Sequence, residues 1–412
     1  MKANTLENTI NRFELYIFIF LILLQVNFFH FSFLPQSLVD LNSDINKQLV
    51  LFVIIISYTI FMVIRYSLKN YKFKYSLTFS IGIFIVTLIV LTLVTKQSYD
   101  IPLFQTFKNS YYYWIIIYFF PCVFVIKNYL NKAVFYLKII GFLDIFIILI
   151  QDIAYFKFGR LILSLDEFSL SMLSVNNRFV TDGDFLLFVS FIIFFIGIWS
   201  KKGINKFDIS YLILFIIHQI FFAKGRVALL IFLCMFAGFL IFYIVKLPKK
   251  YQYMVLLGYA MVGAFMLYNI IIKLSFFSGE RAISGQVRLY EIQYYLEYAK
   301  LHTFWGIGFT DDQLLLHGGF GQLLGGKYSM TDVGVIGYFG IFGYIGVPFI
   351  VSYSIQLIRL CMNSRSLGIT LIVLTYFIGQ CGTLFPLNIP RIFLFTVASA
   401  FVMVLINRDT SK

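Results

Sequence analysis

Four arginines stand at the edges of apolar stretches, where a guanidinium group could bind an anion. They are Arg178 in NNRFVTDGD, Arg226 in FAKGR, Arg288 in GQVRLYE and Arg391 in NIPR. A guanidinium stays charged at any physiological pH and binds phosphate oxygens through two parallel hydrogen bonds. The pattern predicts a diphosphate site in which Arg226 and Arg288 are the main ligands and Arg178 a further one. The alternative is that each arginine reaches lipid headgroups or pairs with a nearby carboxylate.

Candidate proton acceptors lie in one segment of the chain. His317 stands in the glycine-rich run HGGFGQLLGG, and a histidine can act as a base near neutral pH. Asp332 directly precedes an apolar run, a position in which an aspartate caps a helix and the helix dipole stabilises its charged form. We expect His317 to accept the proton and Asp332 to position the loop or a substrate hydroxyl, with the reversed assignment as the alternative. Asp311 and Asp312 are further candidate carboxylates.

The other histidines are expected to have structural roles. His30 and His218 lie within apolar stretches and are predicted to be packed and satisfied, and His302 ends a predicted amphipathic helix. Four cysteines, Cys122, Cys234, Cys361 and Cys381, are widely separated and show no metal or redox spacing. The sequence also lacks a nucleotide-binding phosphate loop, zinc-ligand spacing and a nucleophile elbow. We therefore expect no metal and no cofactor, and an ATP-driven pump is disfavoured.

The chain around these residues is too apolar for a soluble protein. Of its 412 residues, 60% are hydrophobic, 20% aromatic and only 13% charged, and the mean hydropathy is +0.87. Soluble domains carry about 25% charged residues. The apolar blocks of about 17–23 residues match the length of a helix that crosses a bilayer, and backbone amides in lipid must be satisfied by helical bonds. The composition predicts an all-α integral membrane protein with one polytopic domain, residues 1–412.

We expect about twelve transmembrane helices. They are placed near residues 14–34, 48–64, 76–94, 112–126, 134–152, 185–199, 208–222, 227–245, 252–272, 333–355, 367–386 and 390–407. The first block lacks a small-residue cleavage site and is typical of an uncleaved anchor. A long connection, residues 274–331, separates the ninth and tenth predicted spans.

The charge distribution predicts the orientation. The chain has 33 Lys and Arg against 19 Asp and Glu, a net charge of +14. The basic residues gather in alternate short connections, such as those holding Lys69, Lys132, Lys202, Lys250 and Arg365. This alternation follows the positive-inside rule, so both termini are expected in the cytoplasm and residues 274–331 outside it. The excess of positive charge is therefore attributed to topology and anionic lipid, not to nucleic acid.

The long connection holds a predicted amphipathic helix followed by glycine-rich loop. Four apolar residues recur at helical spacing: Leu289, Ile292, Leu296 and Ala299. Ser284 is the expected N-cap of this helix. Such a helix is expected to lie in the membrane interface or against the helix bundle. Gly306, Gly308 and the glycines after His317 let a backbone approach a ligand closely, which predicts a binding surface. In the tenth span, the glycines at 334, 337, 340, 343 and 346 predict close helix packing.

Several of these segments resemble those of the O-antigen ligase and repeat-unit polymerase superfamily of bacterial envelope glycan assembly. The resemblance is carried by KGRVALLIF (224–232), GQVRLYEIQYYLEYAKLHTFWGIGF (285–309) and SMTDVGVIGYFGIFGYIG (329–346), with NNRFVTDGD as a weaker match. The ligases usually place a His-Asn pair before the glycine-rich span, where this chain has Thr331 and Asp332. The departure favours a polymerase over a ligase.

The resemblance implies a metal-independent glycosyltransferase of the bacterial cytoplasmic membrane, with its active site open to the exterior. A glycan on undecaprenyl diphosphate is the donor, and a hydroxyl of a second lipid-linked repeat unit attacks its anomeric carbon. Arg226 and Arg288 would stabilise charge on the leaving diphosphate, and His317 or Asp332 would take the proton. A flippase and a chain-length regulator are the implied partners. The polymer is a capsule, an exopolysaccharide or an O-antigen.

Three other functions were weighed against a polymerase. A glycan ligase of the same superfamily would share the site and the chemistry. A lipid-linked oligosaccharide flippase or another carrier would hold polar residues near the membrane midplane on broken helices, where Asp144 is the chief charged residue of this chain. A non-enzymatic scaffold explains the apolar bulk but not the exterior arginines. The enzyme is the preferred interpretation.

Overall fold

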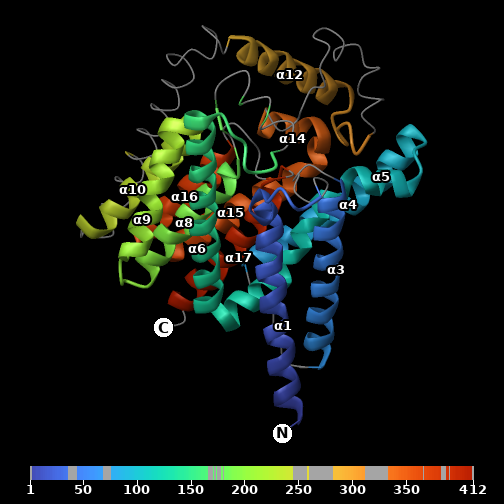
Figure 1. Ribbon diagram of the computed structural model, residues 1–412. Coiled ribbons are helices and arrows are strands. Elements are labelled where there is room, and N and C mark those ends of the chain that lie inside the picture. The colour runs from blue at the N-terminus through green and yellow to red at the C-terminus, as the bar shows by residue number, and fades with distance from the viewer. Residues whose placement is uncertain are drawn as a thin grey trace. The chain divides into compact units, whose positions relative to one another are not determined.

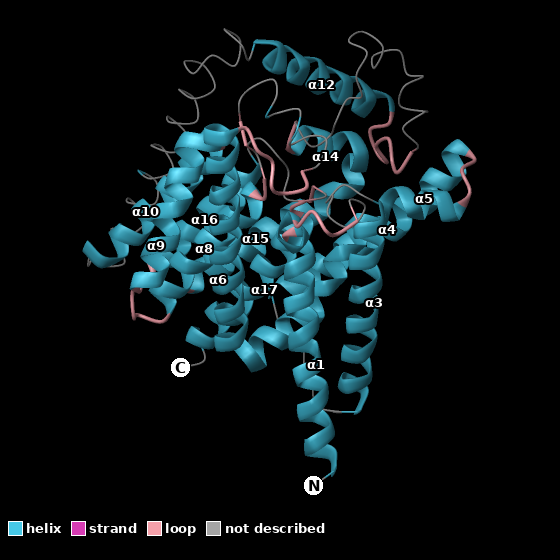
Figure 2. Cartoon of the chain, viewed as in Figure 1, coloured by secondary structure: helices cyan, strands magenta, loops and turns pink. Residues whose placement is uncertain are grey.

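The computed structural model describes residues 2–35, 44–67, 76–165, 170, 173, 178–179, 181–244, 258, 282–310, 333–364, 366–381, 387–388 and 390–410. These residues are predominantly helical and contain no strand, although an isolated antiparallel bridge joins Phe31 and Leu163 (Figures 1 and 2). The chain divides into two compact units. Unit 1 comprises Met1–Ser76, Tyr111–Phe236 and Ile389–Lys412, and unit 2 comprises Leu77–Ser110 and Ala237–Asn388.

Three helical runs of the described chain have the length and apolar composition needed to cross a membrane: Leu77–Tyr99, Leu103–Phe158 and Val335–Asn363. Shorter apolar helices occupy Gln48–Val63, Gly183–Trp199, Arg226–Phe242, Leu367–Cys381 and Ile392–Arg408. The expectation of an apolar, all-helical protein of the membrane type is thereby confirmed. The number of spans and the sides on which the termini lie stay predictions. The ninth predicted span, 252–272, lies outside the described residues except for Gly258.

Unit 1 is a helical bundle. Its elements are α1 (Lys2–Gln25), η1 (Asn27–His30), α3 (Asp44–Ser67), η2 (Tyr111–Tyr118), α6 (Phe119–Phe158), α8 (Gly183–Trp199), α9 (Lys206–Ile217), the π-helical η3 (His218–Phe222), the first part of α10 (Arg226–Ile244) and α17 (Ile392–Thr410). α6 packs against α1, α8, α9 and α17. It bends at Tyr129, whose φ of −128° is not helical, and this bend separates the predicted spans 112–126 and 134–152. α8 is buried around most of its circumference, as an apolar helix in the centre of a bundle must be.

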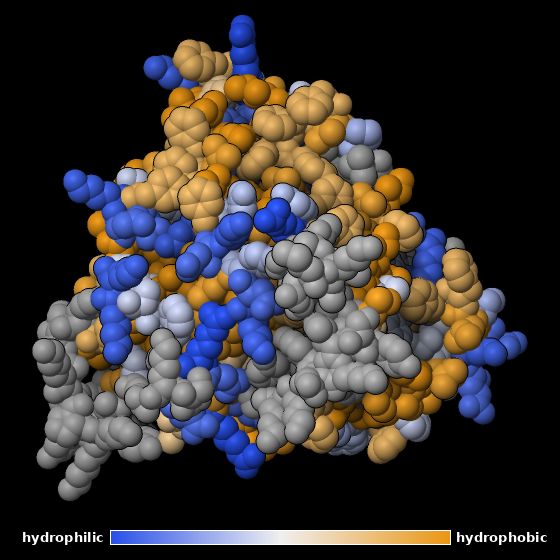
Figure 3. Space-filling model, turned by 90° about the horizontal axis from the view of Figure 1, so that it is seen from below, coloured by the Kyte–Doolittle hydropathy of each residue, from blue (hydrophilic) through white to orange (hydrophobic). Residues whose placement is uncertain are grey.

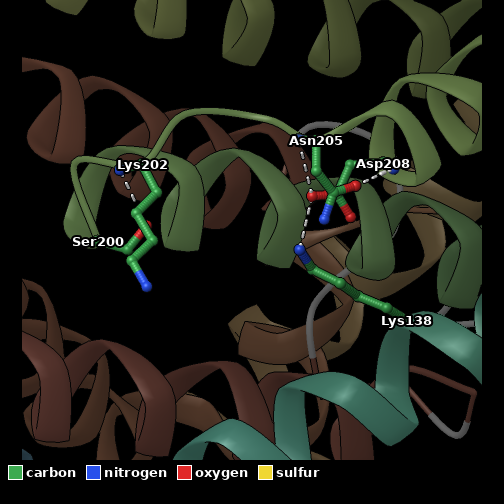
Figure 4. A network of polar contacts seen from close by, with 5 residues as sticks. All are labelled: Lys138, Ser200, Lys202, Asn205 and Asp208. Carbon is green, nitrogen blue, oxygen red and sulfur yellow. Dashed lines mark hydrogen bonds and ion pairs between the residues drawn. The ribbon is translucent and has the colours of Figure 1, made fainter.

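One end of unit 1 is basic. Lys201 and Lys202 lie in the connection from α8 to α9, and Asn205 caps α9 by accepting a hydrogen bond from the Asp208 backbone N–H at 2.8 Å. Lys138 of α6 donates to the Asp208 carboxylate, also at 2.8 Å (Figure 4). Both chain ends and this connection lie toward the lower side of Figure 1.

Many large apolar side chains are exposed on the helices. Phe52 of α3 is 62% exposed and Phe79, in unit 2, is 67% exposed. Hydrophobic residues also cover much of the surface seen from below, around a group of hydrophilic ones (Figure 3). Soluble monomers rarely show apolar surface of this extent, whereas a bilayer covers it without cost.

Unit 2 contains a helix that is interrupted at a glycine. Its elements are α4 (Ser76–Tyr99), α5 (Leu103–Ser110), α12 (Ala282–Leu301), α14 (Val335–Phe342), η6 (Gly343–Gly346), α15 (Val347–Asn363) and α16 (Leu367–Cys381). The tenth predicted span, 333–355, is therefore broken into α14, η6 and α15. Gly343 lies at the break with a φ of +56°, a left-handed conformation that glycine adopts without steric cost.

The helix predicted in the long connection is present as α12. Leu289 and Leu296 are 50% and 46% exposed, which leaves the membrane interface as their expected surroundings, whereas Glu291 is buried. Ser284 lies inside the helix, so its expected role as N-cap is wrong. α12 packs against α14 through a different face.

A glycine recess in α14 explains this orientation. Tyr294 and Tyr295 of α12 are both buried, and the Tyr295 ring occupies the space that a side chain at Gly340 would fill. An apolar stripe on α12 could not fill this recess as a flat ring does. The close packing predicted for the glycines is confirmed at Gly340.

The Gly-Ile-Gly segment serves the helix break, not an open binding surface. Ile307 N–H donates to the Gly340 carbonyl at 2.8 Å, and Gly308 N–H donates to the Ile341 carbonyl at 2.9 Å. Gly306 and Gly308 are buried and have φ values of +65° and +73°. In this conformation the segment donates hydrogen bonds to the Gly340 and Ile341 carbonyls, which have no intrahelical partner because the helix breaks there.

Candidate functional site

The helix ends of unit 1 opposite the basic end carry a group of polar side chains, which we term the polar end cluster. It consists of His30, Asp152, Arg178, Asp182, Asp184, His218, Arg226 and Arg391. These residues come from the ends of α1, α6 and α9 and from the beginnings of α8, α10 and α17. Hydrogen bonds and ion pairs join most of them across long distances in the sequence.

The most deeply buried pair of the cluster is His218 with Asp152. His218 Nδ1 lies 2.9 Å from Asp152 Oδ2, and both side chains are 0% exposed. His218 Nε2 and Asp152 Oδ1 have no hydrogen-bond partner among the described residues. When Nδ1 carries the proton, the aspartate fixes that tautomer and leaves the Nε2 lone pair as a proton acceptor. The expectation that His218 is packed is confirmed, although only one of its two ring nitrogens is satisfied.

His218 also begins a π-helical turn, a distortion that is frequent at functional sites. The Ala223 N–H donates to the His218 carbonyl at 2.9 Å, and the Gly225 N–H donates to the Gln219 carbonyl at 3.2 Å. A side chain at Gly225 would displace the Gln219 amide oxygen. The turn leads directly into α10.

Arg178 and Arg226, both predicted diphosphate ligands, are attached to this turn. Arg178 Nε donates to the Ala223 carbonyl at 3.0 Å, and the neighbouring Phe179 N–H donates to the Phe222 carbonyl at 3.3 Å. Arg226 is the first residue of α10 and is exposed, whereas Arg178 is half-buried. The structure thus brings together two residues that are 48 positions apart.

The end of α1 carries a second pair. α1 ends at Gln25, and the four residues of η1, Asn27 to His30, all have positive φ values. The first predicted span, 14–34, is therefore helical only in its first part. This left-handed turn places His30 Nε2 2.6 Å from Asp182 Oδ2, and both side chains are buried.

Arg391 forms an ion pair, as the alternative interpretation of the arginines allowed. Its Nε and Nη2 atoms lie 2.8 Å and 2.7 Å from the two carboxylate oxygens of Asp184. This bidentate pair joins the beginning of α17 to that of α8. Gln25 Nε2 also donates to the Pro390 carbonyl at 2.8 Å, so the start of α17 is fixed from two sides.

The remaining predicted site residues are not in unit 1. Arg288 is on α12 in unit 2, and its side chain lies outside the described residues. His317, Asp332, Asp311 and Asp312 also lie outside them.

Sequence reasoning missed the two His–Asp pairs. The partners in these pairs are 152 and 66 positions apart, respectively, so no local spacing indicates them. The sequence did contain one indication of a polar site. In NNRFVTDGD, two carboxylates, Asp182 and Asp184, follow Arg178 closely.

The described residues hold no group of three or more His, Cys, Asp or Glu side chains arranged for a metal ion. The four cysteines are free, and Cys122 and Cys361 are buried. No protein-family model matches the chain, and no curated protein matches it.

Proposed function

We propose that this protein is an integral membrane glycosyltransferase that joins undecaprenyl-diphosphate-linked oligosaccharide repeat units into a surface polysaccharide. It would act at the exterior face of the bacterial cytoplasmic membrane, with both termini in the cytoplasm. The observation that carries the proposal is the attachment of Arg178 and Arg226 to the turn that begins at the His218–Asp152 pair. This arrangement combines anion-binding groups with a candidate proton acceptor at one end of a helical bundle.

The position of Arg226 supports an anionic ligand. The beginning of a helix carries partial positive charge from its N–H groups, and an arginine there adds to this charge, so the position is suited to binding an anion. α10 begins at Arg226, and Lys224 lies two residues earlier. A phosphate at this helix end would accept hydrogen bonds from backbone N–H groups and from the guanidinium. Arg178 supplies a second guanidinium beside the same turn.

The reaction would proceed by displacement at the anomeric carbon of the donor. The acceptor hydroxyl oxygen forms the new glycosidic bond while the bond from the anomeric carbon to the diphosphate oxygen breaks. The bonding electrons go to the diphosphate, where Arg226 and Arg178 stabilise the added charge. Arg288 is the further ligand predicted from the sequence. The hydroxyl proton goes to a base. His317 and Asp332 are the candidates from the sequence, and His218 Nε2 is the candidate in the described part of the chain.

Turnover of purified lipid-linked repeat unit in nanodiscs tests this proposal. Arg226→Ala and Arg178→Ala should each lower polymer formation by about 10²-fold or more, the effect of losing one preorganised donor in a transition state. Lysine at either position should restore little, because it offers a point charge without the planar fork. Arg359→Ala is the matched control, since Arg359 is an exposed arginine of α15 outside the polar end cluster. Wild-type turnover by both Arg226→Ala and Arg178→Ala, at equal protein levels, refutes the diphosphate role.

A carrier for lipid-linked oligosaccharide is the second candidate, because α14 and α15 form a broken helix of the kind that carriers use. A carrier and a transferase predict different products from the same liposomes. A carrier moves the labelled lipid-linked repeat unit across the bilayer and leaves its glycan unchanged. A polymerase lengthens the glycan, and a ligase of the same superfamily transfers it to a different acceptor.

A further inference from the structure

Asp144 is a buried carboxylate in the middle of unit 1. It lies on α6, is 0% exposed, and neither of its oxygens has a hydrogen-bond partner among the described residues. The same face of α6 packs against α8, because Gly141, one turn earlier, contacts the side chain of Val189.

Other buried carboxylates of unit 1 each have a partner. Asp208 pairs with Lys138 at 2.8 Å, Asp152 lies 2.9 Å from His218, and Glu14 accepts a hydrogen bond from Ser57 at 2.6 Å. Asp144 differs from them in having no donor at all in the described structure. An ionised carboxylate in such surroundings is strongly destabilising, and buried groups of this kind neutralise instead.

In the described structure, the titratable groups closest in effect to Asp144 are acidic: Asp182 at the beginning of α8 and Tyr211 of α9. Buried polar residues on neighbouring helices include Glu14 and Gln25 on α1, Thr396 and Ser399 on α17, and Ser190 on α8. The basic side chains of the surrounding elements have other partners: Lys138 pairs with Asp208, His218 with Asp152, and Arg391 with Asp184.

The charges of Asp144, Asp182 and His30 do not balance when all three side chains are ionised. Asp182 is buried and lies 2.6 Å from His30. If His30 is protonated and both aspartates are ionised, the three side chains carry one positive and two negative charges. One further positive charge makes the group neutral. A proton can supply it, whereas a metal ion requires more ligands than the described residues assemble.

We propose that Asp144 is a buried proton-binding residue of unit 1, which holds its proton because no donor in the described structure stabilises its ionised form. Ionisable groups inside membrane helices commonly form such sites, because the interior favours their neutral form. Asp144 lies one turn from the point where α6 packs against Val189 of α8. Loss of the proton would place uncompensated negative charge between α6 and α8, so the packing of these helices depends on its occupancy. This inference is independent of the proposed transferase activity.

Infrared difference spectroscopy on the purified protein tests the proposal. Protein grown with isotope-labelled aspartate should show, at neutral pH, the carbonyl band of a protonated aspartate that shifts on exchange into heavy water. The label separates this band from that of Glu14. Asp144→Asn, which is close to the protonated side chain in shape, should remove the band. Absence of the band from the wild-type protein overturns the proposal, and this measurement does not depend on the folding of any variant.

Thermal unfolding in detergent gives a second test. The folded protein would hold a proton that the unfolded chain releases at neutral pH, so wild-type stability should fall as the pH rises above neutral. Asp144→Asn should lose this component of the pH dependence. Asp208→Asn, which breaks a satisfied ion pair, should lower stability and keep the component. A band or a pH dependence that persists unchanged in Asp144→Asn contradicts the assignment, as does stabilisation by sodium at constant pH without a protonated aspartate.

Discussion

Gly306→Ala should destabilise the protein far more than Gly159→Ala, although both glycines have a φ of +65°. An alanine in this left-handed conformation costs about 1–2 kcal/mol. At Gly159, which ends α6, a new Cβ meets nothing within 4 Å, so this conformational cost is the whole effect. At Gly306, the Cβ would overlap the Ile341 carbonyl and lie 2.6 Å from the Gly343 backbone nitrogen. Backbone atoms cannot move aside as a flexible side chain can.

The destabilisation expected for Gly306→Ala can be calculated from the backbone groups that must move. Relieving the overlap separates residues 306–308 from the helix break and lengthens the hydrogen bonds from Ile307 and Gly308, which are 2.8 Å and 2.9 Å long. A buried backbone group left without a partner costs about 1–3 kcal/mol. Two such bonds and the conformational cost together give about 3–8 kcal/mol, against about 1–2 kcal/mol at Gly159.

The assay is thermal unfolding of the detergent-solubilised variants, followed by intrinsic fluorescence. Gly82→Ala is a control without unfavourable φ or nearby atoms, and it should be neutral or slightly stabilising because alanine favours helix. Equal shifts in the midpoints of Gly306→Ala and Gly159→Ala would refute the packing argument. Normal stability of Gly306→Ala with lost turnover would instead restore the earlier expectation that this segment binds a ligand.

The remaining predictions concern the polar groups and the surface of α12. Asp152→Asn should lower glycan polymerisation at least tenfold if His218 acts as the base, and Asp208→Asn, at the opposite end of unit 1, should leave the turnover of the folded fraction unchanged. Asp184→Ala leaves the Arg391 guanidinium buried without its carboxylate partner and should lower the free energy of unfolding by about 3 kcal/mol. Thermal unfolding of a variant that lacks both charges should show a smaller loss of stability. Leu289→Glu places a charge on the exposed face of α12, which should weaken its contact with the membrane and so reduce the quenching of tryptophan fluorescence by brominated lipid. Unchanged quenching would show that this face does not contact the membrane.

The composition predicted the helices because each apolar block needs helical bonding in lipid, and α3, α8, α9 and α17 begin and end close to the expected residues. Two predicted spans, 14–34 and 333–355, were less accurate, because the helix ends early in the first and is interrupted in the second. Nothing in the apolar pattern at residues 26–34 indicates the left-handed turn at the end of α1. The break at Gly343 was also missed, because glycine in an apolar helix more often indicates close packing.

The candidate site was predicted only in part, for a physical reason. Arg178 and Arg226 were identified by charge at the edges of apolar stretches, which is a local property. The partners of His30 and His218 are determined by how α1, α6, α8 and α9 pack, which is a tertiary property. The buried face of α12 depends likewise on the recess at Gly340. His317 and Asp332 remain predictions from the sequence.

The end of α1 is attached to the connection after α6 through main-chain atoms. The Ser164 N–H donates to the His30 carbonyl at 2.8 Å, and an antiparallel bridge pairs Phe31 with Leu163. Every amino acid except proline supplies the same N–H and carbonyl groups. Substitutions at Phe31 and Ser164, whose side chains are not buried, can therefore change the side chains presented here without detaching the two segments. His30, which pairs with Asp182, and the buried Leu163 do not share this freedom.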